Sequence, residues 1–93
     1  MKKYRFLYPA IFIKDEEGHY QVVFPDLDIY IDGDNLSEAY LYAKDLLRVY
    51  FTYALKYETD YAKPTQLEKI ISKCKGNEVV MYVDAYIDEK EIQ

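Results

Sequence analysis

The sequence predicts a single α+β domain with the element order βββα(α)β. Two runs rich in β-prone residues, 4–13 and 20–24, flank a polar stretch that contains a glycine. A long amphipathic stretch opens at Asn35, and a short apolar run, 79–83, lies near the C-terminus. With 93 residues the chain has the length of one domain. We therefore expect a three-stranded antiparallel meander, one long covering helix, a shorter helix and a final strand.

The first two strands are predicted to form a hairpin. Tyr, Phe, Leu, Ile and Val dominate both runs, as is typical of strands. Between the two runs, Gly18 can adopt the positive φ that a tight turn needs. Pro9 cannot donate to a strand ladder, so its part of the first strand is expected at an edge or a bulge.

A third, short strand is expected over residues 27–31. Pro25 and Asp26 end the second strand, because both residue types favour turns. The alternation that follows would place Asp28 and Asp32 on the same side of the third strand.

A long helix is predicted from Asn35 onward. Asn35 and Glu38 have the spacing of a capping box, in which the Asn side chain accepts from a free amide and the Glu reaches back. Apolar residues follow at intervals of three and four, which gives one stripe that covers the sheet. The stripe consists of Leu36, Ala39, Ala43, Leu46, Leu47, Tyr50 and Ala54.

Beside that stripe, Tyr42, Val49 and Tyr53 cluster on one flank of the helix. One sheet face cannot bury this flank as well as the stripe. Either the chain after Lys56 folds back over it, or the three side chains form the contact of a homodimer, for which tyrosine is well suited. We predict a homodimer or higher homo-oligomer through these residues.

The C-terminal third predicts a short helix and a buried strand. Thr65 and Glu68 repeat the capping-box spacing ahead of apolar residues. The run 79–83 is continuously apolar, which is typical of a strand buried on both faces. A right-handed crossover through the helix would return this strand parallel to a strand of the meander.

The charge and the cysteine count exclude several classes of protein. A net charge of -5 disfavours direct binding to nucleic acid and favours a basic partner. The single cysteine, Cys74, permits no internal disulfide, and no apolar run approaches the roughly 20 residues of a membrane span. We expect a cytoplasmic protein that needs no cofactor.

Four aspartates lie in the stretch VFPDLDIYIDGDN, residues 23–35. A metal site would need the spacing of a calcium loop and its terminal Glu, and both are missing. Turn and helix-end preferences explain Asp26 and Asp34 without any ligand, and a solvated strand face explains Asp28 and Asp32. Docking of a basic partner is the functional alternative, because opposed surface potentials speed encounter.

No catalytic arrangement is recognisable. His19 lies in the predicted hairpin tip without a nucleophile or a matching carboxylate, which favours an exposed turn histidine over a catalytic base. Cys74 lies near the end of the second helix without a matching His motif, which favours an idle thiol. We predict no enzymatic activity, no catalytic residue and no bound metal.

Three motifs of this chain resemble the HicB-like antitoxin family. They are YPAIF at residues 8–12, YQVVFPDL at 20–27 and GDNLSEA at 33–39. KPT at 63–65 and the stretch 79–84 are similar to the final segment of that family. The resemblance implies a partial RNase H-like fold, here over residues 1–88, followed by a short charged tail, 89–93. Many members also carry a C-terminal DNA-binding module, which we do not expect in this chain.

The resemblance further implies a partner: HicA, a small toxin that is similar to double-stranded-RNA-binding proteins and cleaves messenger RNA with a histidine. We predict that this chain neutralises such a basic toxin, and we assign the contact to Phe24, Asp26, Leu27, Asp28, Tyr30, Asp32 and Asp34.

Two alternatives to the antitoxin function remain open. The first is a metal-dependent nuclease on the same fold, although residues 4–13 lack the carboxylate that such chemistry needs in the first strand. The second is a stand-alone binding module whose partner is not a toxin.

Overall fold

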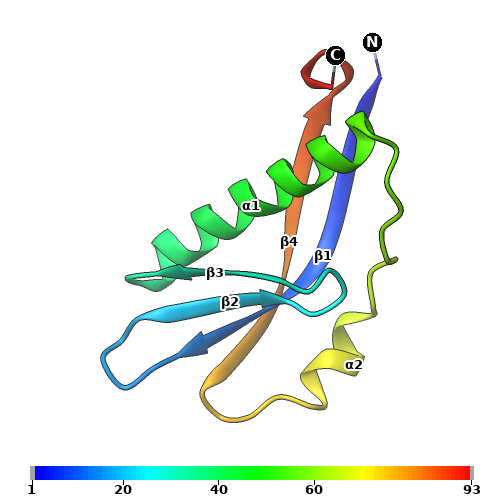
Figure 1. The fold of residues 1–93 in the computed structure, drawn as a ribbon. Helices are drawn as coiled ribbons and strands as arrows, with labels where there is room; N and C mark the ends of the chain where they lie inside the picture. Colours follow the sequence, from blue (N-terminus) through cyan, green and yellow to red (C-terminus); the bar gives the residue numbers. More distant parts are fainter. Residues whose placement is uncertain (1, 93) are drawn as a thin grey trace.

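The computed structural model describes residues 2–92, in which a long helix covers one face of a four-stranded sheet (Figure 1). The sheet order is β3-β2-β1-β4, and every pairing is antiparallel. This arrangement confirms the α+β class and the three-stranded meander. The elements are β1 (Lys3–Lys14), β2 (Tyr20–Phe24), β3 (Ile29–Gly33), α1 (Leu36–Lys56), α2 (Leu67–Ile71), β4 (Glu78–Asp88) and a 3-10 helix, η1 (Glu89–Glu91).

β4 differs from the sequence-based expectation in its direction and its burial. It pairs antiparallel with β1 over its whole length. The expected parallel orientation exists only relative to β2, which lies on the other side of β1 and does not pair with β4. The reason lies at the end of β1, where the Lys14 amide donates to the Asn77 carbonyl at 3.1 Å. The chain therefore enters β4 where β1 ends and must run back along it. β4 is also an edge strand, so Val79 and Tyr82 are exposed rather than buried on both faces.

The two halves of β1 have different neighbours. Residues 11–14 pair with β2, and residues 11–13 also pair with β4 on the other side, whereas the half that contains Pro9 pairs with β4 alone. Proline therefore lies where β2 does not reach, as its missing amide predicts. Beside this half runs the segment after α1, and the Tyr8 hydroxyl donates to the Ala62 carbonyl at 2.5 Å. Burial raises the pKa of Tyr8 to about 12.

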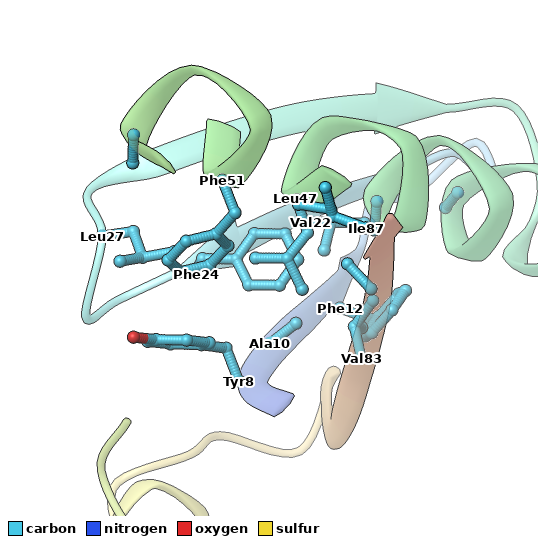
Figure 2. Close-up of a cluster of buried hydrophobic side chains, with 14 residues drawn as sticks. Tyr8, Ala10, Phe12, Val22, Phe24, Leu27, Leu47, Phe51, Val83 and Ile87 are labelled. Atoms are coloured by element: carbon cyan, nitrogen blue, oxygen red, sulfur yellow. The ribbon is translucent and has the colours of Figure 1, made fainter. Parts of the chain in front are cut away.

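α1 packs its buried side chains onto the sheet, and the cluster between the two layers forms the core (Figure 2). Gly33 at the end of β3 lets the start of the helix approach closely, because a Cβ at this position would lie 2.6 Å from the Ala39 Cα. The cap confirms the predicted helix start, because Asn35 Oδ1 accepts from the Glu38 amide at 2.9 Å. Glu38 reaches one residue further back than expected, to the Asp34 amide.

Phe51 is the aromatic centre of the core and was absent from the predicted apolar stripe. Its ring stacks on Phe6 with centroids 3.8 Å apart, and it also contacts Tyr8, Tyr50 and Tyr61. Tyr61 follows α1 in sequence and meets the Phe51 ring edge-on at 4.9 Å. Phe51 therefore joins α1, β1 and the segment after the helix.

Ionic contacts join the opposite flank of α1 to β4 and η1. Lys44 Nζ lies 3.1 Å from Asp84 Oδ1, and this hydrogen bond holds the pKa of the Asp84 carboxyl below its usual value. Arg5 contacts the same carboxylate at 3.5 Å. Arg48 pairs with Glu91 in η1, so residues expected to form a charged tail are bound to the helix.

Candidate functional site

Five carboxylates lie at one end of the sheet, where two loops meet. The first residue of β2, Tyr20, pairs with the last residue of β3, Gly33. The β1–β2 loop therefore lies beside the junction between β3 and α1 (Figure 1). We call this surface the acidic end, and its carboxylates belong to Asp15, Glu16, Glu17, Asp32 and Asp34.

The β1–β2 loop is held by its own first carboxylate. Asp15 Oδ1 accepts from the amides of Glu17 and His19 at 2.9 Å each, and the Asp15 amide donates to the His19 carbonyl. Gly18 takes a φ of 90°, which few other residues adopt readily. The loop is thus fixed by local bonds, while the carboxylates of Glu16 and Glu17 remain exposed.

A small hollow lies between the β1–β2 loop and the end of β3, and its lining includes Asp15, His19, Asp32 and Asp34. His19 Nδ1 stands 3.8 Å from the Asp15 carboxylate and 3.7 Å from that of Glu17. The two chain segments that form the hollow, residues 13–21 and 32–34, carry five carboxylates against one lysine, Lys14, and this histidine. Within residues 2–92, no group of three or more His, Cys, Asp or Glu side chains is placed to hold a metal ion. The excess of carboxylates over cationic side chains in these two segments suits contact with a basic surface.

The face of the sheet turned away from α1 continues the acidic end. Tyr30 and Asp32 lie on this face of β3, opposite Val23 and Gln21 of β2. Tyr30 is 67% exposed although it is a large aromatic residue. Exposed tyrosine is a residue type that protein interfaces favour.

Comparison with known families decides the identity of the domain. The sequence profile of the HicB-like antitoxins of bacterial toxin–antitoxin systems matches residues 8–93. The chain belongs to the HicB-like antitoxin family. No curated protein gives a significant match to the sequence.

Solved structures support the fold of this HicB-like chain. It is similar to a chain in a toxin–antitoxin complex from Streptococcus pneumoniae, with a TM-score of 0.74 at 18% identity over 88% of this chain and 69% of the other. It is also similar to a chain of a HicA3 and HicB3 toxin–antitoxin complex, with a TM-score of 0.67 at 19% identity over 86% of this chain and 98% of the other. At these identities the likeness concerns the fold. In residues 2–92, no helix has the length and apolar character that crossing a membrane requires.

Two residues that the sequence assigned to the partner contact of this HicB-like chain lie in its core. Phe24 is fully buried between the sheet and α1, and Leu27 is buried beside it (Figure 2). Neither side chain is available to a partner in this structure. The correction has a physical reason, since Phe24 belongs to the face of β2 that α1 covers.

Asp28 is not on the strand that carries Asp32. β3 begins at Ile29, two residues later than expected, and the amides of Leu27 and Asp28 both donate to the Phe24 carbonyl in a turn. Asp28 has a φ of 54° in that turn, a conformation that Asp tolerates better than most residues. The expected shared side of one strand is therefore wrong, and Asp28 lies at the end of β3 remote from Asp32.

Asp26 has a structural partner inside the HicB-like domain. Its carboxylate accepts from the Thr65 amide at 2.9 Å and from the Thr65 hydroxyl. This contact ties the β2–β3 turn to the segment that leads into α2. It also corrects the predicted second capping box, because α2 begins at Leu67 and its N-cap residue, Gln66, makes no side-chain cap bond.

The flank formed by Tyr42, Val49 and Tyr53 is exposed in the HicB-like chain. The segment after Lys56 runs beside β1 instead of folding back over the helix (Figure 1). Tyr57 is the exception, since its ring lies 4.6 Å from that of Tyr53. Internal packing therefore does not account for the apolar character of this flank.

Proposed function

We propose that this HicB-like chain is an antitoxin that binds and neutralises a small, basic HicA-type toxin through its acidic end. Family membership and the likeness to chains of toxin–antitoxin complexes support the class of partner. The observation that carries the choice of surface is the gathering of five carboxylates from the β1–β2 loop and from the end of β3 with the residue after it. Of the residues first assigned to the contact, Tyr30, Asp32 and Asp34 remain in it, and Asp15, Glu16 and Glu17 join them.

Charge explains how such a surface can neutralise a ribonuclease. A protein that grips RNA presents Lys and Arg to the phosphates. The exposed carboxylates of the acidic end offer the same cations a competing anionic partner. Attraction between the two surfaces speeds encounter and selects against acidic partners. Bound there, the antitoxin would exclude RNA from the toxin.

Tyr30 adds a contact that charge alone does not provide. Burying a large aromatic ring at the centre of an interface contributes affinity, whereas solvated rim charges mainly govern association. The ring lies on the same face of β3 as Asp32. In this proposal the chain acts by binding, without a catalytic step of its own.

The test is complex formation between the purified chain and the HicA-type toxin encoded beside it, with the catalytic histidine of the toxin replaced by alanine. We expect co-elution in gel filtration. Calorimetry should give an affinity that falls as salt rises, because the Debye length shortens from about 10 Å at 0.1 M to about 3 Å at 1 M. No complex at micromolar concentration, or no small basic protein in the neighbouring reading frame, would favour the stand-alone binding module. An affinity that does not change with salt concentration would indicate that the toxin binds elsewhere than at the acidic end.

A further inference from the structure

The exposed flank of α1 carries a seam with the spacing of a helix pair. Tyr42, Val49 and Lys56 stand seven residues apart, so they drift by only about 20° per step around the helix. Tyr53 lies beside them, and Leu46, which is half-buried, closes the side nearest the core. The proposed toxin contact does not use this seam, which lies on the helix layer of the domain.

We propose that this seam pairs antiparallel with the seam of a second copy of the chain, with Val49 at the two-fold axis. A two-fold axis at Val49 places Tyr42 of one copy opposite Lys56 of the other. The same register places Asp45 opposite Tyr53. Val49 thereby meets Val49 of the second copy, while the two tyrosines meet the side chains of Lys56 and Asp45 across an antiparallel helix pair.

The distribution of charge along the helix selects the antiparallel direction. Glu38 and Asp45 lie in the N-terminal half of this flank, and Lys56 lies at its C-terminal end. A parallel pair would set acid against acid and lysine against lysine. The antiparallel pair brings Asp45 within reach of Lys56 of the second copy, about one helical turn from the position directly opposite, and it also opposes the two helix dipoles.

The shape of the surface at the C-terminal end of the seam is also consistent with this register. A shallow hollow there is lined in part by Val49, Tyr53, Lys56 and Tyr57. Tyr42 of the second copy would project into it. Lys56 already lies over the ring of Tyr57, with Nζ 5.6 Å from its centroid, so the hollow offers both a cation and aromatic faces to an incoming tyrosine.

The geometry leaves the acidic end free in both copies. α1 begins at Leu36, 13 residues before Val49, so antiparallel pairing about Val49 separates the two helix starts by about 39 Å at a rise of about 1.5 Å per residue. The acidic end adjoins the start of α1, and the two acidic ends therefore do not repel each other. A contact of one helix flank is small, so we expect a dimer dissociation constant on the order of micromolar.

The first test compares two substitutions of equal chemistry. Val49 and Leu41 are 62% and 61% exposed on the same helix, but they point about 80° apart. Val49→Asp would place an unpaired carboxylate in the contact and should raise the dimer dissociation constant at least about tenfold in sedimentation equilibrium. Leu41→Asp should leave it unchanged. A monomeric wild-type chain at tens of micromolar, or equal effects of both substitutions, would overturn the proposal.

The second test addresses the direction of pairing. Asp45→Lys and Lys56→Asp should each weaken the dimer about threefold or more, and the double variant should restore it, because the ion pair across the seam is re-formed with its signs exchanged. Failure of the double variant to recover would contradict the antiparallel register. The assay uses the chain alone, so its outcome is separate from that of toxin binding.

Discussion

Replacing Glu16 and Asp32 together by lysine should slow association with the HicA-type toxin about tenfold or more at low salt. Both carboxylates are exposed; Glu16 lies in the β1–β2 loop and Asp32 lies near the end of β3. The change therefore replaces attraction by repulsion at one surface while leaving the Asp15 bonds of the loop intact. Stopped-flow or surface-binding kinetics at two salt concentrations would measure the effect, which should shrink at high salt.

The matched control is the pair Glu58→Lys and Asp60→Lys. It changes the net charge by the same amount, but it lies in the segment that follows α1, far from the β1–β2 loop (Figure 1). If both double variants slow association equally, only the net charge of the chain matters and the acidic end has no special role. Circular dichroism would establish that each variant is folded.

Phe51→Ala is expected to lower the free energy of unfolding by about 3–5 kcal/mol, the usual cost of removing a buried aromatic ring. The side chain is fully buried, and its ring contacts aromatic residues of β1 and of the segment after α1. Domains of this size are stable by about 5–15 kcal/mol, so the variant should be close to unfolding. Urea denaturation, analysed for a change in midpoint at constant slope, would measure the loss.

Tyr86→Ala is the control for that loss. Tyr86 is an aromatic residue of β4 that is 58% exposed, so its removal should change the free energy of unfolding by less than about 0.5 kcal/mol. A loss below about 1 kcal/mol for Phe51→Ala would contradict the central place of this ring in the core.

Local patterns in the sequence predicted the local structure well. The glycine of the first hairpin and the Asn35 cap specify bonds between near neighbours, and the structure has both. Phe51 was missed because it lies at the border of the apolar stripe, and only β1 and Tyr61 make that border a buried position. The burial of β4 was misjudged for a related reason, since an apolar run does not reveal whether a strand lies at the edge of its sheet.

The candidate site shows the same limit. Asp26, Asp28 and Asp32 are close in sequence, yet one binds Thr65, one lies in a turn and one belongs to the acidic end. The prediction that these neighbouring aspartates form one contact surface therefore grouped residues that the fold separates. It also omitted Glu16 and Glu17, although an antiparallel meander necessarily brings the tip of the first hairpin beside the end of the third strand.

The most direct measurement of the antitoxin function is the cleavage of messenger RNA by the co-encoded HicA-type toxin while this chain is titrated in. We predict that cleavage stops near equimolar chain, and that the chain alone leaves RNA intact in the presence of Mg²⁺ or Mn²⁺. Cleavage that continues when the chain is in large excess would contradict neutralisation. Metal-dependent cleavage by the chain alone would instead support the nuclease alternative.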